Sequence, residues 1–133
     1  MADYPNLRKW LILKIAEINE MDPSLRVEGR IVKLLICGEP KGILSDSKGF
    51  MVGVSIWPAG IATPPPHDHE AEELYLILEG EGELLQGGET RKVKKGTAVF
   101  HPSRVKHGIV TVDETMTLLW ILSPGGTYPH LPS

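Results

Sequence analysis

From residue 30 onward, the sequence consists of short apolar segments separated by turns rich in glycine, proline and serine. Segments of about four to eight residues with such boundaries are typical of β-strands. Eight strands are predicted, over residues 31–37, 50–57, 73–79, 82–86, 90–93, 97–100, 107–112 and 116–122. Gly87 and Gly88 predict a two-residue hairpin, since glycine readily adopts the positive φ angles of such turns. The pattern predicts a sandwich, a jelly roll or a closed barrel.

The N-terminal part of the chain has a different pattern. Apolar residues at positions 7, 10, 11, 15 and 18 follow the spacing of one helical face, and Pro5 and Pro23 supply boundaries. An amphipathic helix is therefore predicted over residues 7–18, with its apolar face against the barrel or a partner subunit. The expected division is an N-terminal helical segment (1–24), a β-barrel (25–123) and a tail rich in proline and glycine (124–133).

Composition and charge narrow the functional classes. The 133 residues fit one domain, and 41% hydrophobic with 23% charged residues is typical of a soluble globular protein. A net charge of -3 with mixed signs does not suit a nucleic-acid partner. No apolar run approaches the roughly 20 residues of a membrane helix, and no secretory signal is visible, so a cytoplasmic location is expected. Cys37 is the single cysteine, which excludes an internal disulfide.

Three of the five histidines occur with acidic residues in a pattern that suits a metal ion. His67 and His69 are two positions apart, so their imidazoles project to the same side of an extended chain. Glu73 opens the next predicted strand and can add a carboxylate, and His107 opens a later strand. The candidate ligands of one divalent metal ion are therefore His67, His69, Glu73 and His107.

The donor set also indicates the kind of metal. Imidazole and carboxylate favour a divalent transition metal such as iron, manganese, nickel or zinc over magnesium or calcium. Four protein ligands leave two positions of an octahedral ion for substrate, dioxygen or water. The alternative is that these histidines are exposed loop residues, which would suit an isolated His-x-His better than one accompanied by a carboxylate and a distant histidine. Glu72 is a weaker candidate than Glu73, and neither His101 nor His130 is expected to be a ligand.

The same residues resemble the two motifs of the cupin superfamily. The first motif is matched by Gly60, His67, His69, Glu73 and Gly80, although six residues rather than the usual five separate Gly60 from His67. The second motif is matched by Gly96, Pro102 and His107, with Arg104 in place of a usual glycine and Thr111 in place of a usual asparagine. The resemblance implies an all-β fold, the double-stranded β-helix or jelly-roll barrel of cupins.

Tyr75 is the candidate catalytic residue. It shares a predicted strand face with Glu73, which would direct its phenol into the barrel near the metal. A phenol beside a divalent cation can have a lowered pKa and act as a general base, whereas the alternative is that Tyr75 only fills the interior.

A narrower resemblance supports the catalytic alternative. The segments Pro66-His67, Glu73-Leu74-Tyr75 and Phe100-His101-Pro102 resemble the cupin lyases that cleave dimethylsulfoniopropionate, in which a metal-proximal tyrosine abstracts a proton. That resemblance implies that Tyr75 is the base and that the four candidate ligands hold the metal.

The sequence thus predicts a metal-dependent cupin enzyme that acts on a small organic molecule by oxygenase, lyase or isomerase chemistry. Arg104 or Lys106 could hold a substrate carboxylate at the barrel mouth. The competing prediction is a non-catalytic sensor or ligand-binding cupin with a structural metal, which a barrel filled by Trp57, Met51 or Trp120 would favour. Cupins commonly pair through an edge strand and a swapped terminal segment, so a homodimer is expected.

Overall fold

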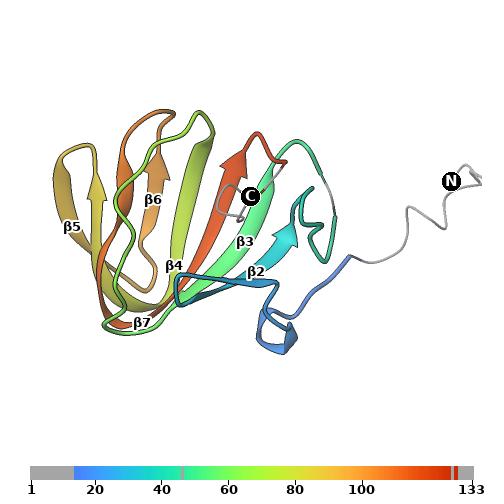
Figure 1. The fold of residues 1–133 in the computed structure, drawn as a ribbon, viewed down its shortest axis with the longest axis horizontal. Coiled ribbons are helices and arrows are strands. Elements are labelled where there is room, and N and C mark those ends of the chain that lie inside the picture. The colour runs from blue at the N-terminus through green and yellow to red at the C-terminus, as the bar shows by residue number, and fades with distance from the viewer. Residues whose placement is uncertain (1–13, 46, 127, 129–133) are drawn as a thin grey trace, which may run out of the picture.

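The computed structural model describes residues 14–45, 47–126 and 128, and within them the all-β prediction is confirmed. One 3₁₀ turn, η1 (Ile18–Glu20), precedes the strands (Figure 1). The strands are β1 (Leu25–Val27), β2 (Arg30–Ile36), β3 (Met51–Trp57), β4 (Glu72–Gln86), β5 (Glu89–Lys94), β6 (Ala98–His101) and β7 (His107–Ser123). No helix in the described ranges is long and apolar enough to cross a membrane.

The strands form one antiparallel sheet in the order β1-β2-β3-β7-β4-β5, with β6 also paired to β4. The two longest strands, β4 and β7, pair from Glu72 opposite Ser123 to Gln86 opposite His107. On its other edge, β4 pairs with β6 near its start and with β5 near its end. Figure 1 shows the sheet curling between β2 and β5, so that its concave side encloses the core.

Two strand breaks predicted from the sequence are wrong. Residues 73–79 and 82–86 belong to the single strand β4, and residues 107–112 and 116–122 belong to β7. The pairing of these strands shifts register four times, between Ile77 and Leu84. Gly80 has a φ of 82°, and a Cβ atom there would overlap the carbonyl oxygen of Thr115. The chain therefore bends at this glycine without leaving the sheet, because bulges allow a strand to turn and stay paired.

The predicted N-terminal helix is not supported. Residues 7–13 of its range lie outside the described residues, and residues 14–17 have no helical structure. Ile18 begins only the three-residue turn η1, and Glu17 before it is extended. Ile15, which belongs to the predicted apolar face, is 69% exposed. A short helix depends on packing of its apolar face, and the described part of this face has little.

Two hairpins frame the sheet. The predicted turn at residues 87–88 is confirmed, since Gln86 pairs with Glu89 and Gly87 has a φ of 65°. A second hairpin joins the unpredicted strand β1 to β2 through Glu28 and Gly29, which have φ angles of 50° and 86°. This turn places Arg30 first in β2, on the same face as the core residues Val32 and Leu34.

Candidate metal centre

Three separate elements bring the candidate ligands together. His67 and His69 lie in the loop that leads to β4, Glu73 lies near the start of β4, and His107 begins β7. The backbones of His67 and His107 form a bridge in which each N–H donates to the other carbonyl, at 2.9 and 2.8 Å. This bridge fixes the loop to β7, and both residues that form it are candidate ligands.

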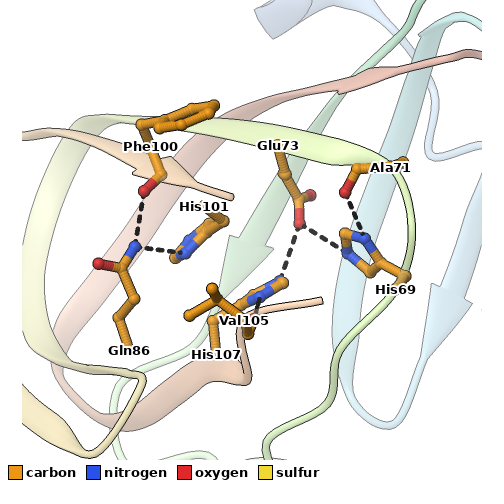
Figure 2. A network of polar contacts seen from close by, with 8 residues as sticks. All are labelled: His69, Ala71, Glu73, Gln86, Phe100, His101, Val105 and His107. Carbon is orange, nitrogen blue, oxygen red and sulfur yellow. Dashed lines mark hydrogen bonds and ion pairs between the residues drawn. The ribbon is translucent and has the colours of Figure 1, made fainter. Parts of the chain in front are cut away.

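The four side chains converge on one point. Ring nitrogens of His67, His69 and His107 all lie within 4.8 Å of one another. Oε1 of Glu73 lies 3.0 Å from Nε2 of His107 and 3.2 Å from Nε2 of His69, as Figure 2 shows. Two donor atoms that are each about 2.1 Å from a metal ion and at right angles to one another are about 3 Å apart. The spacing of this carboxylate and these imidazoles therefore fits a shared ion.

The second nitrogen of each of two rings is held by the backbone. Nδ1 of His69 donates to the carbonyl of Ala71 at 2.8 Å, and Nδ1 of His107 donates to the carbonyl of Val105 at 2.9 Å (Figure 2). Because a carbonyl oxygen only accepts, both Nδ1 atoms carry a proton. With Nδ1 protonated, loss of the Nε2 proton would leave each ring with a lone pair directed toward the position that a metal ion would share with Glu73, which is the orientation that backbone carbonyls commonly give to metal-binding histidines.

One known protein family matches the part of the sequence that contains the candidate ligands. A family model described as the cupin domain matches residues 53–122, slightly more than half of the 133 residues. The chain belongs to the cupin family. The cupin resemblance of the histidine motifs is thus confirmed, and the matched range contains every candidate ligand.

Individual cupins show how far the similarity extends. Dimethylsulfoniopropionate lyase DddQ of Ruegeria pomeroyi is 39% identical over 102 residues, 71% of this chain and 49% of the lyase. Its solved structure matches with a TM-score of 0.62 at 32% identity, over 81% of this chain and 50% of that one. Ectoine synthase from P. lautus matches with a TM-score of 0.69 at 19% identity, over 86% of this chain and 80% of that one. The chain spans about half the length of the lyase, and it shares the fold alone with ectoine synthase.

The protonation of Glu73 and of the histidines beside it is interdependent in this cupin site. Burial raises the pKa of the Glu73 carboxyl, but hydrogen bonds from His107 and His69 outweigh burial and hold that pKa below its usual value. The hydrogen bond to Glu73 raises the pKa of His69, against the opposing effect of burial. The metal-free site therefore binds protons beside a charged carboxylate, and a metal ion would replace those protons.

Tyr75 lies inside the cupin barrel, where the sequence placed it. Its side chain is buried two residues from Glu73, and its ring stands edge-on to His101 with 4.4 Å between the ring centroids. Burial and the charge of Glu73 raise the pKa of its phenol well above the ordinary value. The phenol is therefore protonated in the metal-free protein.

His101 adjoins the site although it was not expected to be a ligand. It is fully buried and stacks on His107, with 4.0 Å between ring centroids. The amide nitrogen of Gln86 donates to Nδ1 of His101 and to the carbonyl of Phe100 (Figure 2). Burial lowers the pKa of His101 to about 4, so the ring is neutral with its proton on Nε2. The Phe100-His101-Pro102 segment was the sequence signal that pointed to this residue.

A cavity that is partly open to solvent adjoins the candidate ligands. It has about 50 Å³ of space for the centres of water molecules, which is enough for a few of them. Its lining includes His67, His69, Glu73 and Tyr75, together with Trp57 and Trp120. The interior around Tyr75 is therefore not packed solid.

The cationic side chain that lines the cavity is not one of the two that the sequence predicted at the barrel mouth. Neither Arg104 nor Lys106 lines the cavity, and Arg104 is exposed and paired with Asp68 at 3.3 Å. Arg30 lines the cavity instead. Sequence reasoning missed it, although its position in the alternation of β2 is an inward one.

Proposed function

We propose that this cupin is a metal-dependent enzyme that acts on a small organic molecule. One divalent ion of iron, manganese, nickel or zinc would be held by His67, His69, Glu73 and His107. The observation that carries the proposal is the convergence of three imidazoles and a carboxylate beside a cavity that His67, His69 and Glu73 line. Such an ion supplies Lewis acidity or a binding position for oxygen.

The protein groups around the ion would orient it and limit what reaches it. The carbonyls of Ala71 and Val105 fix two imidazole rings, so that little rearrangement is needed when a ligand binds. Trp57 and Trp120 supply apolar walls that exclude most water. The limited volume of the cavity favours a substrate of few heavy atoms.

Lyase chemistry is a narrower candidate, with Tyr75 as the base. It is favoured by the 39% identity to dimethylsulfoniopropionate lyase DddQ and by the position of Tyr75 in the cavity wall beside Glu73. Burial keeps the Tyr75 phenol protonated, so proton abstraction needs an added positive charge near its oxygen. As the phenolate, Tyr75 would take the proton from the carbon beside the substrate carboxylate. The C–H electron pair would form a C=C bond as the C–S bond breaks and dimethyl sulfide leaves, and the phenol would then release the proton to solvent.

The test begins with elemental analysis of the freshly purified protein. About one equivalent of a transition metal is expected, and His67→Ala and His107→Ala are each expected to lose it. Protein loaded with each of the four metals is then assayed against small-molecule substrates, including dimethylsulfoniopropionate with release of dimethyl sulfide as the readout. Tyr75→Phe is expected to keep the metal and lose turnover if Tyr75 is the base.

The outcomes separate the functional classes. Absence of metal binding by the wild-type protein contradicts the proposal as a whole. Metal binding and ligand binding without turnover under any of the four metals would favour the alternative, a non-catalytic sensor or ligand-binding cupin with a structural metal. Turnover of other substrates but not of dimethylsulfoniopropionate would contradict only the narrower lyase assignment.

We also propose that the protein forms a homodimer. Leu74 of β4 and Phe100 of β6 are cross-strand neighbours, and they are 38% and 54% exposed. Adjacent exposed apolar side chains of this kind are common in subunit contacts. Sedimentation at micromolar concentration is expected to show a dimer, and a monomer alone would contradict this proposal.

A further inference from the structure

Arg30 is a buried cation in the wall of the cavity. Its residue exposure is 5%, and it begins β2 on the face that also carries Val32 and Leu34. An arginine is rarely buried to this extent unless an anion is paired with it, because removal of its charge from water is costly. The burial of Arg30 therefore raises the question of which anion balances its charge.

The protein supplies neutral contacts to this guanidinium. It lies over the ring of Trp57, 4.6 Å from the centroid, and it is hydrogen bonded to the side chain of Tyr128. Among the described residues, no aspartate or glutamate oxygen lies within 4.0 Å of an Arg30 nitrogen. Glu73 is the buried carboxylate of the same cavity, and its hydrogen-bond partners are His69 and His107. Among the side chains that the structure describes, none therefore neutralises the charge of Arg30 by direct contact.

Trp57 supplies a second buried polar group, its indole N–H. Nε1 of Trp57 is buried and has no hydrogen-bond partner among the described residues. Trp57 lines the cavity beside Arg30 and stacks on it. A buried donor of this kind is costly unless a ligand accepts from it. The guanidinium thus supplies N–H donors and a single positive charge to the cavity wall, and the residue beside it has an indole N–H that is unpaired among the described residues.

We propose that Arg30 binds a carboxylate group of the substrate, so that the substrates of this cupin are small carboxylates. The proposal rests on the proposed function, since it concerns the cavity that adjoins the candidate metal ligands. A guanidinium binds a carboxylate through two parallel hydrogen bonds, which fixes orientation as well as charge. One arginine in a cavity of this volume suits a monovalent carboxylate better than a phosphate, which usually requires several donors or cations. The carboxylate at Arg30 would direct the rest of the molecule toward Tyr75 and the candidate ligands.

The test compares propionate with propionamide, which has nearly the same shape and no charge. The full-length protein is titrated with each compound, both zinc-loaded and zinc-free, and the indole ¹⁵N–¹H signal of Trp57 reports binding. The wild type is expected to bind propionate about tenfold more tightly than propionamide, as the loss of a charged hydrogen-bond partner predicts. In the zinc-free protein, where no metal ion can bind the carboxylate, Arg30→Gln is expected to bind both compounds equally. Arg26→Gln, which removes an exposed arginine from the neighbouring strand β1, is the matched control and should retain the preference.

Two results would overturn the proposal: a wild type that binds both compounds equally in both metal states, or a zinc-free Arg30→Gln variant that keeps the preference. Thermal melting checks that the variant folds, and Arg30→Met, which can still pack on Trp57, replaces it if it does not. The zinc-free titration separates this proposal from the proposed function. A protein that binds no zinc but prefers propionate through Arg30 would contradict only the metal centre, and a zinc-binding protein without the preference would contradict only the role of Arg30.

Discussion

A single carboxylate oxygen organises the candidate metal centre. Oε1 of Glu73 is within hydrogen-bonding distance of both His69 and His107, and Glu73 is only 7% exposed. Since buried carboxylates need partners, the two imidazoles stabilise Glu73 as much as Glu73 orients them. The charge of this one side chain raises the pKa of His69, and we expect it also to set the affinity of the centre for a metal ion.

Replacement of Glu73 by glutamine tests that role. Glu73→Gln removes the negative ligand and the hydrogen-bond acceptor that raises the pKa of His69. Zinc affinity is expected to fall by roughly a hundredfold or more, beyond the range seen for groups that only support a ligand. A chelator-competition titration measures the affinity. Glu72→Gln, an exposed neighbour in β4, should leave the affinity unchanged, and an equal loss in both variants would contradict the assignment of Glu73.

The pH dependence of metal binding follows from the same contact. The pKa of His69 is raised by Glu73, so this ring keeps its proton to a higher pH than an ordinary histidine does. Only the unprotonated Nε2 binds a metal, whereas the lowered pKa of Glu73 keeps the carboxylate charged. Zinc affinity is therefore expected to fall steadily from about pH 8 to about pH 6, by up to roughly tenfold per unit for each proton displaced. The same competition titration at several pH values measures it, and a constant affinity over this range would contradict the proton coupling.

The path of β4 is constrained where its backbone lies close to the backbone of β7. At Gly80 a side chain would overlap the backbone of β7, and at Gly82 a Cβ atom would overlap the carbonyl oxygen of Thr111. The bend in β4 separates the part that carries Glu73 and Tyr75 from the part that pairs with β5. The position of the site residues thus depends on these two glycines.

Substitution of Gly80 by alanine is expected to destabilise the fold strongly. The φ of 82° is unfavourable for alanine, and its Cβ would overlap the backbone at Thr115. The free energy of unfolding should fall by more than about 2 kcal/mol, beyond the conformational cost alone. Urea denaturation measures it. Gly88→Ala, at a position with no heavy atom within 4 Å of the added Cβ, is the matched control and should change the stability by less than about 0.5 kcal/mol.

Local patterns predicted much of this architecture, and contacts between distant strands determined the rest. Strand positions followed from alternation and turn residues, and the approach of His67 to His107 followed from the cupin motifs. The continuity of β4 could not be predicted, because a glycine that ends a strand and one that bends it have the same local sequence. His101 joins the site through its pairing opposite Glu73, which is a matter of register between β4 and β6.

Arg30 was missed for a different physical reason. Its charge predicts exposure, while the alternation of β2 directs it inward. The buried position depends on contacts with Trp57 and Tyr128, which are distant in the sequence. Arg30 is thus buried by its strand position and its contacts, against the ordinary preference of its charge.

At the scale of the whole molecule, the candidate ligands connect parts of the chain that are far apart. The loop before β4, strand β4 and strand β7 each contribute at least one candidate ligand. A bound ion would therefore link these elements in the folded protein and not in the unfolded chain. Zinc at about 100 times its dissociation constant is expected to stabilise the protein by about 2.7 kcal/mol, or roughly 10 °C in melting temperature. Calorimetry with zinc and with a chelator measures the shift. The melting temperature of His107→Ala should not respond to zinc, and an equal shift in that variant would point to binding elsewhere.

The bridge between His67 and His107 also has an evolutionary consequence. Because the backbones of these two residues bond to each other directly, the chain is brought back into register at His67 whatever path it takes from Gly60. The extra residue between Gly60 and His67 can then be absorbed by the intervening loop. A change of length in residues 61–66 could then leave the backbone of His67 in place while it moves Pro64 and Pro65, which line the cavity. This loop is therefore where related chains could differ in length, and so in access to the cavity, with the candidate ligands still held together by the bridge.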